Sequence, residues 1–146
     1  MPKLNEAHIQ RTCTEYLELD GWRSLRTDPM SRRDWGKGFG ELGMADYLYI
    51  RYHPRSYEFH HDREVPNGIG GWDKGVTAQA VVMWIEWKRI GGKPTIAQAE
   101  WHKAERAHGA LTLVAGVDFP ASIEGFMGWY RTSGLLRNQR LGAKIG

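Results

Sequence analysis

The sequence contains the stretch Ala80-Val81-Val82-Met83-Trp84-Ile85-Glu86-Trp87-Lys88, in which a near-continuous apolar run ends with two charged residues. A run of this length and composition predicts a β-strand that is covered on both faces. Because successive side chains of a strand point to opposite faces, Glu86 and Lys88 share one side and Trp87 lies on the other. Charged groups on such a strand need a reason, since the interior of a protein rarely holds unpaired charge.

The segments on either side of this strand alternate between helical and extended patterns. Helices are predicted over residues 5–19, 95–108 and 122–131, and further strands over residues 44–50 and 110–117. Thr95 is a good N-cap for the second helix, and Gly109 stops it at the usual position. Residues 22–43 have the turn residues of an irregular or hairpin segment. The order helix, strand, strand, helix, strand, helix indicates one layered α/β domain.

Length and composition agree with a single domain over residues 1–146. Apolar residues make up 41% of the chain and charged residues 25%, as in most globular proteins. The sequence has no apolar run of about 18 residues and no apolar signal block at its start, so we expect an intracellular, cytoplasmic protein without a membrane partner, from a bacterium or a phage. The single cysteine, Cys13, excludes an internal disulfide and a multi-cysteine zinc site.

Two polar segments stand out from this domain. Residues 52–79 are expected to form an insertion between the two central strands. Residues 132–146 form a basic tail, because no acid follows Glu124 while four arginine or lysine residues do. The formal net charge is +3, so the tail suits a polyanion such as nucleic acid, although a solvated terminus explains it equally well.

The strand that contains Asp46 and the strand that contains Glu86 and Lys88 together supply the residues of a metal-dependent hydrolase. Two carboxylates can hold a hard divalent cation such as Mg²⁺, which keeps several of its waters. Such a cation polarises a phosphate and lowers the pKa of a bound water, and a neighbouring lysine offsets the charge that develops on phosphorus. A lone Glu-x-Lys is weak evidence, since a surface ion pair on an edge strand looks the same. The apolar surroundings of Glu86 favour function.

Four motifs in order resemble a known family. They are Glu6 in the first helix, Gly43-Met44-Ala45-Asp46, Ile85-Glu86-Trp87-Lys88, and Gln98-Ala99-Glu100-Trp101. Together they look like the virus-type replication-repair nuclease domain of the PD-(D/E)XK, or restriction-endonuclease-like, superfamily. The resemblance covers most of residues 5–117, and it implies a central mixed sheet flanked by helices.

The resemblance also implies a role for each motif. Asp46, Glu86 and the backbone carbonyl of Trp87 would hold Mg²⁺ or Mn²⁺, and Lys88 would be the catalytic lysine. Glu6 would hold a second metal or its water, and Gln98 would support the site. The implied activity is that of an endodeoxyribonuclease, a phosphodiesterase acting on DNA. Branched DNA as the substrate and a homodimer as the assembly are further expectations that come from the resemblance alone. The alternative is a non-catalytic nucleic-acid-binding module on the same fold.

The sequence departs from the family in two places. Ala45 replaces the proline that usually precedes the aspartate, which is a mild change. Asp46 and Glu86 are 40 positions apart, more than compact members of the family need. Neither departure removes a functional group, and the insertion is a segment that could contact the substrate.

Several of these residues have plainer interpretations. Thr95 to Gln98 is a capping box, so Gln98 could cap the helix, support the site, or do both. Glu6 could be a first-turn acid favoured by the helix dipole. The histidines of the insertion, His60 and His61, suggest a different metal hydrolase, but a solvated loop explains them better. The remaining histidines, His8, His102 and His108, fall on helices or close to their ends, where surface or boundary roles suffice.

One loop is the best guess for a contact with nucleic acid. It contains the aromatic Trp35, which could stack on an unpaired base, beside the basic residues Arg32, Arg33 and Lys37. A plain structural role for the tryptophan, as an anchor of its loop, is the more common case.

Overall fold

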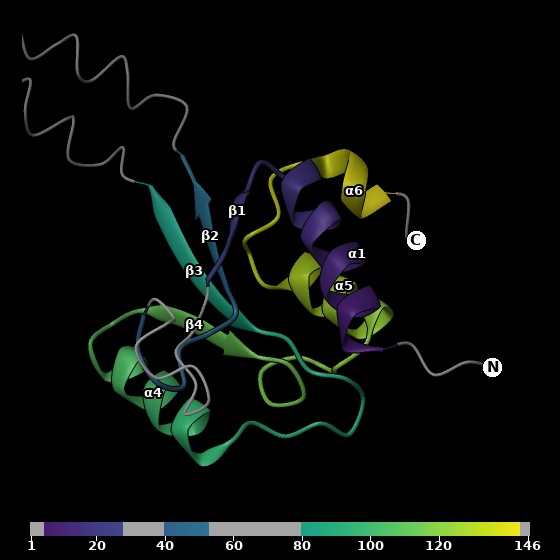
Figure 1. The fold of residues 1–146 in the computed structure, drawn as a ribbon. Coiled ribbons are helices and arrows are strands. Elements are labelled where there is room, and N and C mark those ends of the chain that lie inside the picture. The colour runs from purple at the N-terminus through teal and green to yellow at the C-terminus, as the bar shows by residue number, and fades with distance from the viewer. Residues whose placement is uncertain (1–4, 28–39, 53–79, 144–146) are drawn as a thin grey trace, which may run out of the picture.

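The computed structural model describes residues 5–27, 40–52 and 80–143 (Figure 1). In chain order its elements are α1 (Glu6–Leu19), β1 (Arg23–Arg26), β2 (Tyr47–Arg51), β3 (Val81–Glu86), α4 (Ile96–Ala107), β4 (Leu111–Val114), α5 (Ile123–Thr132) and α6 (Gln139–Ala143). These elements form a single α/β domain with a mixed sheet flanked by helices, as the sequence predicts.

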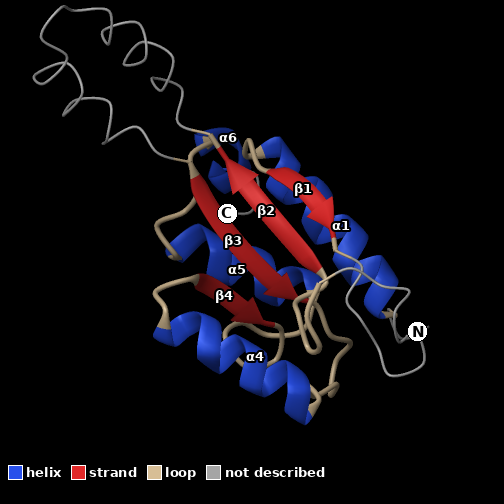
Figure 2. Cartoon of the chain, turned by 60° about the vertical axis from the view of Figure 1, so that its left-hand side comes forward, coloured by secondary structure: helices blue, strands red, loops and turns tan. Residues whose placement is uncertain are grey.

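The four described strands form one sheet in the order β1-β2-β3-β4 (Figure 2). The first two pairs are antiparallel, and β3 pairs with β4 in parallel. Parallel neighbours need a crossover connection, and α4 provides it. The mixed sheet follows from this one crossover, since the other strands run in alternating directions.

The main core lies between the sheet and the helices α1 and α5, which pack on the same face (Figures 1 and 2). Alternate residues of β3 and the residue after it point into this core, where Met83, Ile85 and Trp87 are fully buried. The Trp87 ring makes edge contacts with Phe119 and Phe126. Trp87 therefore anchors the end of β3 from behind, as expected, and turns Glu86 toward the opposite face.

The opposite face of β3 is covered only at its carboxyl end. Trp84 packs edge-on against Trp101 of α4, with ring centroids 5.2 Å apart. Val82, two residues earlier on the same face, is 44% exposed. The prediction of a strand covered on both faces is therefore wrong for its first half, because α4 runs alongside β4 and reaches only the end of β3.

Two short elements were not identified by the sequence pattern. β1 lies within the segment interpreted as irregular or hairpin, and it pairs with β2 from Arg23 opposite Ile50 to Arg26 opposite Tyr47. α6 lies within the expected basic tail. Most of the proposed insertion falls outside the described residues. Among the helices that the structure describes, none has the length and apolar character needed to cross a bilayer.

A buried polar cluster joins the C-terminal segment to the end of α1. Asp20 accepts hydrogen bonds from the Arg51 guanidinium at 3.1 Å and from the hydroxyl of Tyr130. It also accepts from the backbone N–H groups of Arg137 and Asn138, at 3.0 and 2.6 Å. Because these donors satisfy the buried carboxylate of Asp20, the cluster has a structural role in positioning the chain beyond α5.

Candidate functional site

The sheet register places Asp46 opposite Glu86. Tyr47, the first residue of β2, pairs with Ile85, and Glu86 is the last residue of β3. Asp46 comes one position before the ladder begins, so it faces Glu86 across the two antiparallel strands, where opposed side chains share a face. The two acids interact directly, and each carboxyl affects the pKa of the other. The convergence expected of these two residues is therefore present.

Glu86 is a fully buried carboxyl group with two donors on one oxygen. Its side chain is 1% exposed, and its Oε1 accepts from Gln98 Nε2 at 2.7 Å and from Lys88 Nζ at 3.1 Å. Lys88 Nζ also donates to Gln98 Oε1 at 3.0 Å, which closes a triangle of three side chains. The triangle fixes the ammonium group beside the acid pair.

The other oxygen of Glu86 has a different environment. Oε2 is buried and accepts no hydrogen bond from the described residues. Burial and the adjacent Asp46 carboxylate raise the pKa of Glu86, although Lys88 acts in the opposite direction. Burial likewise raises the pKa of Asp46. Two acids this close cannot both be ionised at low cost unless a cation lies between them, and without a cation they share a proton.

Gln98 performs both roles that the sequence left open. Thr95 Oγ1 accepts from Gln98 N at 3.1 Å, and Gln98 Oε1 accepts from Thr95 N at 2.8 Å, which completes the capping box. The same side chain contacts Glu86 and Lys88. Its amide is oriented by the helix start, so the first turn of α4 positions the triangle.

Gly43 brings the chain before Asp46 close to α4. Its φ is +80°, in the left-handed region that favours glycine. A Cβ at this position would overlap the carbonyl of Ala97 and lie 2.8 Å from Gln98 N. Glu41, two residues earlier, accepts a hydrogen bond from Trp101 Nε1 at 2.8 Å. These contacts hold residues 41–46 against the helix that also carries Gln98.

The structure does not link Glu6 to this site. Glu6 lies in the first turn of α1, is half-buried, and forms no hydrogen bond or ion pair with Asp46, Glu86 or Lys88 in the part of the chain that the structure describes. Its position suits the plainer interpretation, an acid favoured by the helix dipole. The expected nucleic-acid contacts at Arg32, Arg33, Trp35 and Lys37 lie outside the described residues, as do His60 and His61.

The chemistry of the donor set fits a hard divalent cation. Within residues 5–27, 40–52 and 80–143, no three side chains of the types His, Cys, Asp or Glu converge on one point. Side chains would therefore supply only the Asp46 and Glu86 carboxylates, and the backbone carbonyl of Trp87 is the next group along the chain. Mg²⁺ is held in this way in proteins, because it retains several waters and takes few carboxylate ligands. The unpartnered Oε2 of Glu86 offers a lone pair for such an ion.

Two features near the site were missed by sequence reasoning. Arg26, the last residue of β1, lies close enough for its charge to lower the pKa of Asp46. Only the pairing of β1 with β2 brings it there, so no local signal predicts it. His102, for which a surface or boundary role was expected, is fully buried, with Nδ1 bonded to the Thr112 hydroxyl. Burial and the charge of Arg106 lower the pKa of His102 to about 4.

Comparison with protein-family models, with curated protein sequences and with solved structures finds no match for this chain.

Proposed function

We propose that this protein is a Mg²⁺- or Mn²⁺-dependent phosphodiesterase that cuts DNA, with Asp46 and Glu86 holding the ion and Lys88 as a catalytic residue. The observation that carries the proposal is the contact between two carboxyl groups: Glu86 Oε2 is buried and accepts from no described donor, and the Glu86 side chain interacts with the Asp46 carboxyl. A structural ion pair would need only Glu86 and Lys88. A second carboxyl group raises the free energy of such a pair, and a bound cation would reverse that cost.

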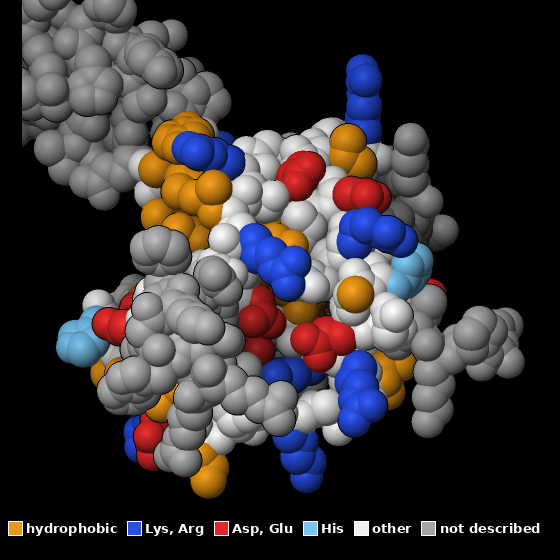
Figure 3. Space-filling model, viewed as in Figure 1, with side chains coloured by type: hydrophobic (Ala, Val, Ile, Leu, Met, Phe, Trp, Pro, Cys, Tyr) orange, Lys and Arg blue, Asp and Glu red, His pale blue; other side chains and the backbone are white. Residues whose placement is uncertain are grey.

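The charge of the surrounding surface suits an anionic substrate. Figure 3 shows acidic side chains in a hollow near the middle of one face of the molecule, with basic side chains around it. An acidic centre with a basic rim is what a site needs if it holds both a cation and a phosphate. When bound, a divalent ion would polarise the phosphate and lower the pKa of a water molecule.

The residues of this chain would do the remaining work. Glu86 would bind the cation in its ionised form, and Gln98 holds the Oε1 atom through its 2.7 Å hydrogen bond, which leaves Oε2 without a described donor. An ammonium group has three donors, of which Lys88 gives one to Glu86 and one to Gln98. The third is left for a phosphate oxygen or the attacking water, where it would stabilise the charge that develops on phosphorus. Gln98 acts through these two residues and is a positioning residue.

The choice of DNA as substrate, and the family assignment, depend on the motif resemblance. The order Asp46, Glu86-x-Lys88, Gln98 is that of the virus-type replication-repair nucleases within the PD-(D/E)XK superfamily. The mixed sheet with a crossover helix after the Glu-x-Lys strand supports this proposal, since the helix carries Gln98 to the site.

A cleavage assay tests the proposal. Labelled duplex DNA and a labelled four-way junction are incubated with the protein in Mg²⁺, Mn²⁺ or EDTA. We expect products that require metal and disappear with Glu86→Ala, while the exposed Glu100→Gln on α4 is an unaffected control. Binding without products in any metal would overturn the nuclease and favour the non-catalytic binding module.

A further inference from the structure

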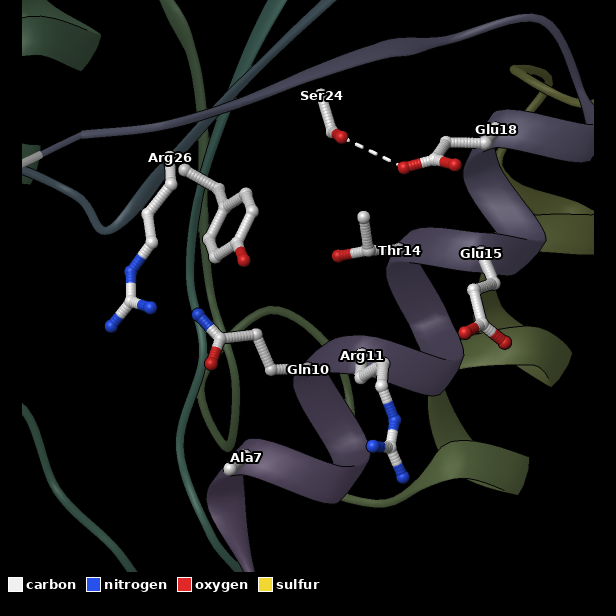
Figure 4. A pocket seen from close by; sticks show the side chains of 9 residues that line it. Ala7, Gln10, Arg11, Thr14, Glu15, Glu18, Ser24 and Arg26 are labelled. Atoms are coloured by element: carbon white, nitrogen blue, oxygen red, sulfur yellow. Dashed lines mark hydrogen bonds between the residues drawn. The ribbon is translucent and has the colours of Figure 1, made fainter.

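A groove of about 500 Å³ lies between α1 and the β1–β2 edge of the sheet (Figure 4). The lining residues that matter for a ligand are Gln10, Arg11, Glu15 and Glu18 of α1 and Arg26 and Tyr47 of the two strands. The function proposed above does not use this groove. Its volume suits one unit of a ligand such as a nucleotide, and a duplex is much too wide to enter it.

Arg26 connects the groove to the candidate metal site. Its side chain lines the groove, and in the sheet it lies opposite Tyr47, the residue next to Asp46, so that its charge also acts on the Asp46 carboxyl. Arg26 is exposed, and the described residues accept no hydrogen bond from its guanidinium group. Figure 4 shows Gln10 extending from α1 into the same space. A phosphate next to the one at Asp46 and Glu86 would therefore meet a guanidinium with free donors.

Tyr47 supplies an aromatic wall. It is half-buried, and its ring stacks on Tyr49 with centroids 5.6 Å apart and an angle of 17° between the planes. Tyr49 is itself held by hydrogen bonds with Thr14, at 2.8 Å, and from Trp87 Nε1, at 2.9 Å. The Tyr47 ring is thus fixed in place before any ligand binds, which lowers the entropy cost of stacking a base on it.

The charges along the groove would orient a bound nucleotide, because its two ends differ in sign. Arg26 and Arg11 carry positive charge, whereas Glu15 and Glu18 lie further along α1, and Glu18 accepts a hydrogen bond from Ser24 at 2.8 Å. A phosphate is attracted to the arginine end and repelled from the acidic end. The strand would therefore pass close to Arg26 and would not continue along α1.

We propose that this groove binds one unpaired nucleotide of the substrate strand next to the scissile phosphate, with Arg26 on its phosphate and Tyr47 stacked on its base. This inference rests on the proposed nuclease function. The substrate would then be DNA with an unpaired segment at the cleavage point, because a base that is still paired cannot enter a groove of this size.

The test measures binding and cleavage separately. Binding of a fluorescent oligothymidine strand to the full chain is followed by anisotropy in EDTA over a range of salt concentrations. Arg26→Ala should weaken binding and reduce the slope of log K against log salt by about 0.7, the value of one phosphate contact on a single strand. Arg23→Ala, at the other end of the same strand and outside the groove, should leave the slope unchanged.

Tyr47 is tested with two substitutions. Tyr47→Leu should weaken binding of the strand roughly 10-fold, and Tyr47→Phe should retain it, because stacking needs the ring and not the hydroxyl. In Mg²⁺, both Arg26→Ala and Tyr47→Leu should raise KM for a duplex with a single-stranded arm more than they raise KM for a fully paired duplex.

The outcomes separate the two proposals. Metal-dependent cleavage in which Arg26→Ala and Tyr47→Leu behave like Arg23→Ala would overturn the groove and leave the nuclease intact. Loss of strand binding in these variants, in a protein that cuts no DNA in any metal, would support the groove and overturn the nuclease. Arg26 is exposed, so its substitution tests the groove even if Tyr47→Leu reduces stability.

Discussion

The free energy of unfolding of the metal-free protein should show how much stability is lost because the Asp46 and Glu86 carboxyl groups lie side by side. The pKa of Glu86 is raised above its ordinary value of 4.5 in the folded state, so folding favours its protonated form. Stability from this group is present below pH 4.5 and is lost as the pH rises through the raised value. Glu86→Gln keeps the size of the side chain, removes its charge, and replaces Oε2 by an amide donor beside Asp46.

The magnitude follows from the contacts. A buried charged acceptor without a partner costs about 1–3 kcal/mol. The substitution removes that cost. It also weakens the 3.1 Å contact with Lys88 by about 1 kcal/mol, because the amide oxygen still accepts from the ammonium group and Asp46 remains as its counter-charge. Above the raised pKa of Glu86, the variant should therefore be at least as stable as the native protein in EDTA, with a gain of up to about 2 kcal/mol. For a domain of this size, that corresponds to a rise in Tm of up to about 6 °C.

Thermal unfolding followed by circular dichroism checks this expectation, with Glu100→Gln as a control for a general charge effect. Mg²⁺ should raise the Tm of the native protein, because a ligand that binds only the folded state stabilises it, and should raise that of the variant much less. A Glu86→Gln variant that is less stable than the native protein in EDTA at every pH would refute the reasoning. Glu86 would then be a structural partner of Lys88.

Three other substitutions have definite expected effects. Lys88→Met should lower kcat of DNA cleavage by about 100-fold or more, because a donor to developing charge is lost, and single-turnover kinetics measure it. Gly43→Ala should lower Tm and slow cleavage, because the positive φ at this position and the overlap of the new Cβ with the Ala97 carbonyl cost about 1–3 kcal/mol. A Tm unchanged from the native value would contradict this packing. Asp20→Asn should destabilise the protein by about 3–5 kcal/mol in urea unfolding, because Arg51 is left as an uncompensated buried charge. Since the cluster is structural, kcat per folded molecule should stay unchanged, and a lower kcat would contradict this role.

Much of the fold was predictable because its longer elements carry strong local signals. Helix α4 begins at a capping residue and ends before Gly109, whose φ is +88°, and β3 is an apolar run. The two elements missed, β1 and α6, have four and five residues, too few to show a period. β1 is a strand only because β2 provides hydrogen-bond partners along one edge.

Sequence alone indicated that Asp46, Glu86 and Lys88 belong together, because charged residues are rarely tolerated on apolar strands. The motif resemblance added Gln98 to this group. The tertiary structure decided the rest. The antiparallel register brings Asp46 opposite Glu86, and the pairing of β1 brings Arg26 beside them, whereas the start of α1 leaves Glu6 without a described contact to the group. Such contacts join residues far apart in the chain, and their geometry depends on the packing of every element between them.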